Sequence, residues 1–212
     1  MRHFIVAGAF AVMLTSASAH AEIIDRILAV VNGALIMQSD VMMAVRLELV
    51  PGSSAPDSMA APLDALIERR LVLEEVDRYA PPDPGEADVD RRLNEVRARA
   101  GIAFEAVLRE SGISVDQLRR QMRDDLRIDA YLLQRFGAMQ PSEEEIQQYY
   151  RDHQSTLMRN GVIRPLDEIR DQVRSELMAN QRAVMIKDWI AGLRRRATIN
   201  VLPRPSSVPP TP

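Results

Sequence analysis

The sequence contains no cysteine, and aromatic residues make up only 4% of it. Without cysteine the chain can form neither disulfides nor cysteine-based metal or nucleophilic sites, so its stability depends on packing. Its apolar N-terminal stretch, residues 4–14, is shorter than the roughly 18 residues that a membrane-spanning helix requires. The net charge of −3 gives no basic surface of the kind that binds nucleic acid. We therefore expect no membrane span in the mature form and no nucleic-acid partner.

Signatures of catalysis are equally scarce. His153 is the only histidine after residue 20, and it stands beside Asp152 at the polar end of a predicted helix, where a solvent-exposed side chain is the simpler interpretation. No glycine-rich phosphate-binding motif occurs. The carboxylates of residues 124–125 and 143–145 lie on a polar helix face and at a helix N-terminus, where acidic residues are favourable for structural reasons. We therefore predict no catalytic residue, no metal site and no cofactor.

The first 21 residues have the features of a secretory signal peptide. Arg2 and His3 give a weakly basic start, an apolar segment follows, and residues 19–21 read Ala-His-Ala, which fits an A-x-A cleavage site. We expect cleavage after Ala21 and a periplasmic location for the mature chain.

A β-hairpin is predicted near the start of the mature chain. Residues 27–31 and 34–37 are short apolar runs, and the Asn32-Gly33 pair between them favours a tight turn with positive φ at both positions. We expect Ser39 to cap a helix over residues 40–49.

A further strand is predicted at the other end of the chain. Apolar and polar residues alternate over 197–202, and Pro203 ends the pattern. Because an isolated hairpin is only marginally stable in water, we predict that this C-terminal strand pairs with the hairpin to form a small sheet.

Helical periodicity, capping signals and chain breakers predict six further helices. They cover approximately residues 62–79, 88–100, 104–111, 114–136, 142–153 and 165–196. The helix over 62–79 is apolar on two sides, which places it at the centre of the domain. The last helix changes its apolar face partway along. Leu166, Ile169, Val173, Leu177 and Val184 share one side, and Ile186, Trp189, Ile190, Leu193 and Ala197 share the other. Two faces imply two successive packing partners, and Trp189 is expected in the core beside the hairpin.

The fold class is therefore mainly α, with a small hairpin sheet completed by a C-terminal strand. We predict a helical domain over residues 22–136, a short helix and linker over 137–164, and a returning helix and strand over 165–203. The proline-rich tail, residues 204–212, is expected to be disordered.

Several segments together resemble the SurA-type and PrsA-type periplasmic chaperones. These are VVNGALIMQSDV, DALIERRLVLEEVDR, PSEEEIQQYYRDH, and PLDEIRDQVRSELMANQR leading to WIAGLRRRATINVL. The resemblance covers nearly all of residues 22–202. In that family, one or two parvulin prolyl isomerase domains lie between the helix with the Tyr-Tyr pair and the final helix, where this chain has only residues 154–164. The resemblance therefore implies a helical chaperone core without the isomerase domain, and no enzyme.

Methionine is common, with 11 residues in the sequence, and flexible thioethers suit surfaces that accept varied apolar partners. Core filling is the simpler interpretation for Met37 and Met122. Aromatic and apolar side chains in and around the predicted helix over residues 142–153 are candidates for an exposed client-binding surface. They are Phe136, Met139, Tyr149, Tyr150, Leu157 and Met158.

Three functional hypotheses follow. The leading one is an ATP-independent periplasmic chaperone that binds unfolded outer-membrane or secreted proteins through an apolar crevice. The second is a dedicated structural or assembly partner of one envelope protein. The third, a peptidyl-prolyl isomerase, is suggested by the family resemblance alone.

Overall fold

The computed structural model describes residues 25–50, 59–138, 140–158 and 161–203. The predicted signal peptide, residues 51–58, Met139 and the proline-rich tail lie outside them. The fold is mainly α with a small sheet, as predicted. In chain order the elements are β1 (Ile27–Val31), β2 (Ala34–Met37), α1 (Gln38–Arg46), α2 (Ala60–Tyr79), α3 (Glu86–Ala100), the 3-10 helix η1 (Gly101–Ala103), α4 (Phe104–Ser111), α5 (Val115–Phe136), α6 (Glu143–Asp152), α7 (Gln154–Leu157), α8 (Leu166–Arg196) and β3 (Ile199–Val201).

The three strands form one antiparallel sheet in the order β2-β1-β3. Asn32 and Gly33 have φ values of 48° and 90°, which confirms the tight turn that the sequence predicts. The C-terminal strand pairs with β1, and Ile199 lies opposite Val31. Two backbone hydrogen bonds extend the ladder beyond its ends. The amide of Asn32 donates to the carbonyl of Thr198 at 2.9 Å, and the amide of Leu202 donates to the carbonyl of Leu28 at 2.9 Å. The first and last elements of the described chain are thus joined.

The first helix differs from the prediction at both ends. It begins at Gln38, so Ser39 lies inside the first turn and does not cap it. Ser39 instead bonds to Asp25, which accepts from its hydroxyl and, at 3.1 Å, from its backbone N–H. Asp40 accepts from the backbone N–H of Met37 at 2.8 Å. The helix ends at Arg46 because Glu48 turns the chain with φ of 54°.

Capping boxes begin two of the helices. The Ser114 hydroxyl accepts from the backbone N–H of Gln117 at the start of α5, and Ser142 and Glu145 form the equivalent pair at the start of α6. The one-turn helix α7 was not predicted, since four residues are too few to show helical periodicity.

Buried side chains form three clusters. The sheet core combines the sheet with α2, α5 and the end of α8, and includes Val31, Ile67, Val72, Val76, Tyr131 and Leu193. The α3–α5 core includes Met43, Leu47, Val89, Phe104, Val107 and Leu118. The α6–α8 core consists of Ile146, Leu157, Ile169, Val173 and Leu177. Both apolar sides of α2 face the sheet core, which confirms its predicted central position.

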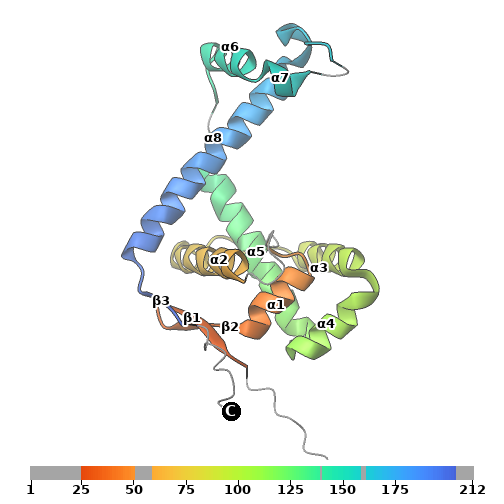
Figure 1. Ribbon diagram of the computed structural model, residues 1–212, viewed down its shortest axis with the longest axis vertical. Helices are drawn as coiled ribbons and strands as arrows, with labels where there is room; N and C mark the ends of the chain where they lie inside the picture. Colours follow the sequence, from red (N-terminus) through yellow and green to blue (C-terminus); the bar gives the residue numbers. More distant parts are fainter. Residues whose placement is uncertain (1–24, 51–58, 139, 159–160, 204–212) are drawn as a thin grey trace, which may run out of the picture.

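Helix α8 connects two of these clusters. In Figure 1 it runs from the sheet to α6 and α7 at its far end. Its first half buries Ile169, Val173 and Leu177 in the α6–α8 core, and its second half packs Trp189 and Leu193 on the sheet core. The two successive packing partners that the change of apolar face predicted are therefore present. Of the described helices, none is long and apolar enough to span a membrane.

Two carboxylates at the contacts of α5 have pKa values shifted in opposite directions. Burial raises the pKa of Asp125 even though Arg69 donates to it at 2.7 Å. Hydrogen bonds from Arg119 and Arg123 lower the pKa of Glu86, on α3. Asp125 therefore contributes stability that is present at acid pH and is lost as pH rises through its raised folded-state pKa. Glu86 contributes stability that is present at neutral pH and is lost as pH falls through its lowered folded-state pKa.

This contrast gives a test by urea denaturation between about pH 3 and pH 7. As pH rises, we expect the unfolding free energy of the wild type to fall relative to Asp125→Asn and to rise relative to Glu86→Gln. Parallel pH profiles for the wild type and the two variants would contradict the assigned shifts.

Candidate functional site

The middle of α8 exposes apolar side chains between its two packed halves. Val184 is 59% exposed and Met185 is 36% exposed. Both line an open pocket of about 610 Å³ together with Gln140, Glu145, Asn180 and Gln181. We call this pocket, formed by α8, α6 and the segment before α6, the crevice.

Helix α6 is held against α8 by polar contacts at the rim of the crevice. The side-chain amide of Asn180 donates to the Tyr149 hydroxyl at 2.8 Å, and that of Gln181 donates to Glu145 at 3.0 Å. Glu145 also accepts from the backbone N–H of Ser142 at 2.7 Å. The bonds from the Ser142 backbone and hydroxyl are the largest cause of a lowered pKa at Glu145, so this carboxylate is ionised at neutral pH.

The composition of the crevice suits an extended polypeptide. Its apolar side chains are flexible or branched and can contact varied partner side chains. The amides of Gln140, Asn180 and Gln181 can both donate and accept, as a peptide backbone requires. No group of three or more potential metal ligands of the His, Cys, Asp or Glu type occurs within the described residues. The arrangement supports binding by contact and hydrogen bonding.

Two of the predicted client-binding residues are buried. Phe136 packs its ring against Trp189, with 5.6 Å between ring centroids. Leu157 lies in the α6–α8 core. Since they belong to different packing regions, the structure does not bring the six predicted residues together in one surface.

The other predicted residues surround α6. Tyr149 and Tyr150 are partly buried against the α6–α8 core, and the Tyr150 hydroxyl donates to the carbonyl of Arg164 at 2.8 Å. Met158 is exposed, and Met139 lies outside the described residues. The roles of these side chains in client binding stay a prediction, with Tyr149 placed closest to the crevice by its bond at the rim.

Sequence reasoning missed Val184 and Met185. Val184 was assigned to the same apolar face as Leu177, and that face was expected to be packed. The structure shows that α6 covers the face only as far as Leu177. A signal was present, because polar Asn180 and Gln181 interrupt the stripe before Val184, which indicates a change from core to surface.

The helical core, the hairpin closed by a C-terminal strand and the long returning helix define the class of this structure as a SurA-like chaperone fold. A solved structure from a study of two structurally related SurA-like chaperones of Campylobacter jejuni, the virulence factor PEB4 and the periplasmic protein Cj1289, superposes with a TM-score of 0.51. It is 12% identical in sequence, and the match covers 84% of this chain and 100% of that one.

In sequence the chain is similar to Chaperone SurA from Bordetella pertussis (strain Tohama I) and from Bordetella bronchiseptica (strain RB50). Each is 30% identical over 119 residues, which is 51% of this chain and 22% of the relative. The similarity thus spans about a fifth of the length of these curated relatives. No protein-family model matches the chain. The resemblance to SurA-type chaperones that the sequence motifs predict is confirmed.

Proposed function

We propose that this protein is an ATP-independent periplasmic chaperone that binds unfolded outer-membrane or secreted polypeptides in the crevice. Similarity to Chaperone SurA in sequence and a SurA-like fold support the chaperone assignment. The observation that carries the proposed site is the uncovered apolar stretch of α8 at Val184 and Met185, which lies between two packed halves of the same helix.

Binding at this site would be weak per contact and reversible. Burying the two exposed side chains contributes about 1–2 kcal/mol each, and the amides at the rim replace the hydrogen bonds that a peptide backbone loses to water. Such contacts depend little on the order of side chains in the client, because neither a methionine nor an amide demands one partner. The crevice would therefore accept many extended apolar segments.

The test replaces the two apolar residues together. We expect Val184→Ser with Met185→Ser to weaken binding of an extended apolar peptide by about 10-fold or more, since two side-chain contacts are removed. The same variant should lose most of its ability to suppress aggregation of an unfolded porin. Peptide affinity is measured by isothermal titration, and aggregation by light scattering.

A matched control carries Ile102→Ser with Val115→Ser. These residues are 105% and 36% exposed, on η1 and at the start of α5. Both double variants should melt close to the wild type, because exposed side chains contribute little to stability. Equal loss of binding in the two double variants, or none in either, would refute the crevice as the site. Recovery of one stoichiometric partner from the periplasm, in place of many clients, would instead identify a dedicated assembly partner.

A further inference from the structure

Asp188 lies on the same line of α8 as the side chains that line the crevice. Successive residues of a helix are rotated by about 100°, so Gln181 and Asp188 both lie within about 10° of the direction midway between Val184 and Met185. Asp188 is exposed and stands one turn after Val184. The apolar stretch in the crevice therefore has an acidic residue at its C-terminal end.

Glu145 supplies a second carboxylate at the other end of this stretch. Its Oε1 accepts from the side-chain amide of Gln181 at 3.0 Å, which places it about one turn before Val184. Its Oε2 accepts from the backbone N–H of Ser142 at 2.7 Å and from the hydroxyl of Ser142 at 2.8 Å. An ionised carboxylate has about four acceptor positions, so these three neutral donors leave room for a further donor from a bound partner.

Neither carboxylate is neutralised by a cation of the described chain. Among the residues that the structure describes, no arginine, lysine or histidine forms an ion pair with Glu145 or Asp188. The nearest cations along α8, Arg182 and Lys187, are each turned about 110° away from the line of the crevice. The guanidinium of Arg135, on α5, lies over two aromatic rings. The apolar stretch is thus flanked by two negative charges.

The spacing of the two carboxylates suits an extended chain. Gln181, which holds Glu145, precedes Asp188 by about two helical turns, or about 10 Å. In an extended chain, alternate side chains point to the same side, and those at i and i+4 are about 13 Å apart. Long basic side chains are flexible enough to shorten this distance to about 10 Å. The side chain at i+2 then faces the apolar stretch between the carboxylates.

We infer that the crevice selects extended client segments with the pattern basic–x–apolar–x–basic. The two basic side chains pair with Glu145 and Asp188, and the apolar side chain between them covers Val184 and Met185. The inference rests on the proposed function and names the class of polypeptide that the crevice prefers. Because exposed ion pairs contribute little energy, they set the choice and register of the segment more than the strength of binding.

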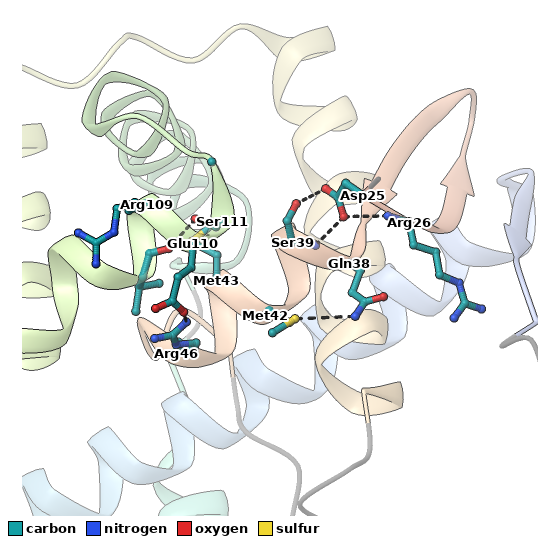
Figure 2. Close-up of a pocket in the computed structure, with 12 residues that line it drawn as sticks. Asp25, Arg26, Gln38, Ser39, Met42, Met43, Arg46, Arg109, Glu110 and Ser111 are labelled. Carbon is teal, nitrogen blue, oxygen red and sulfur yellow. Dashed lines mark hydrogen bonds and ion pairs between the residues drawn. The ribbon is translucent and has the colours of Figure 1, made fainter. Parts of the chain in front are cut away.

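A pocket between α1 and the end of α4 has a different charge pattern. It measures about 440 Å³ and is lined by three arginines, Arg26, Arg46 and Arg109. In Figure 2 both of its carboxylates are already bonded, Asp25 to Ser39 and Glu110 to Arg46. A basic segment would meet like charges there and no unpaired carboxylate. We therefore expect the preference for basic flanks at the crevice and not at this pocket.

The test compares two peptides of identical composition that differ only in the order of their central residues. One carries Arg-Ser-Leu-Ser-Arg and the other carries Ser-Arg-Leu-Arg-Ser, which turns both arginines to the side opposite the leucine. Binding to the chain without its predicted signal peptide is followed by NMR titration of the Met185 methyl group, which also locates the peptide in the crevice. We expect the first peptide to bind about threefold or more tightly than the second, and the difference to vanish when salt rises from about 0.02 M to about 0.5 M.

Two substitutions remove the flanking charges. Glu145→Gln keeps a side chain that can complete the capping box at the start of α6, and Asp188→Asn changes an exposed position. In the double variant the two peptides should bind within about 1.5-fold of each other, and Asp188→Asn alone should give an intermediate preference. The matched control, Asp116→Asn with Glu105→Gln, changes exposed acidic residues on α5 and α4 and should keep the wild-type preference. Thermal denaturation confirms that all variants fold.

The outcomes separate this inference from the proposed function. Loss of the preference in the double variant, with the control unchanged, supports the inference. A preference that survives in the double variant overturns it, as does equal binding of both peptides to the wild type while Met185 still responds, and both results leave the proposed function standing. If Met185 responds to neither peptide, the crevice is not the binding site and the inference fails with it.

Discussion

Deleting residues 197–202 is expected to lower the thermal midpoint by about 8–16 °C. The deletion removes β3, which supplies the second neighbour of β1, and with it the bond from the amide of Asn32 to the carbonyl of Thr198 and the pairing of Ile199 with Val31. About four backbone hydrogen bonds at roughly 1 kcal/mol each correspond to a shift of this size in a chain of about 200 residues. Loss of the packing of Ala197 and Ile199 on the sheet core adds to it.

The matched control is Val201→Thr, which keeps the ladder and changes one exposed side chain. This variant should melt within about 2 °C of the wild type, because exposed side chains contribute little to stability. Circular dichroism at 222 nm follows both transitions. A deletion protein that melts like the wild type would show that β3 is not needed to hold the hairpin.

Much of this arrangement was predictable because its signals are local. The Asn32-Gly33 turn needs positive φ at both positions, and few residue pairs other than this one suit it. The pairing of β3 followed from a physical requirement, since a two-stranded hairpin needs further partners to be stable. The change of apolar face along α8 likewise required two partners, and the structure supplies the α6–α8 core and the sheet core.

The misses have a common cause in contacts between distant parts of the chain. Ser39 looked like a helix cap because nothing nearby in the sequence competes for its hydroxyl, but Asp25, 14 residues earlier, does so. Val184 looked like a core residue because it continues an apolar stripe, but the α6–α8 core stops at Leu177 and leaves Val184 uncovered. Phe136 was a candidate for the exposed client-binding surface, but its ring is buried against Trp189.

None of the predicted client-binding residues that the structure describes lines the crevice, so their role stays a prediction. Sequence reasoning selected α6 and its surroundings, and the crevice indeed lies beside α6. The apolar side chains in it come from α8, on a turn whose exposure depends on how far α6 extends. The part of α6 that adjoins the crevice is its start, where the Ser142–Glu145 capping box fixes the first turn, and this position cannot be read from the pattern of α8.

Client binding in the crevice is tested most directly by crosslinking from within it. The photoreactive residue p-benzoylphenylalanine is placed at position 185 in the crevice or, as the control, at position 102 on η1, where the side chain is fully exposed. An unfolded porin is added, the sample is irradiated, and the adduct is quantified on a denaturing gel. Folded porin serves as a second control.

We expect at least about 10 times more adduct at position 185 than at position 102, because a site that gains 1.4 kcal/mol of binding is occupied about tenfold more. Adduct at position 185 should decrease when folded porin replaces unfolded porin. Equal crosslinking at the two positions, or none at position 185 while the protein still suppresses aggregation, would contradict the account.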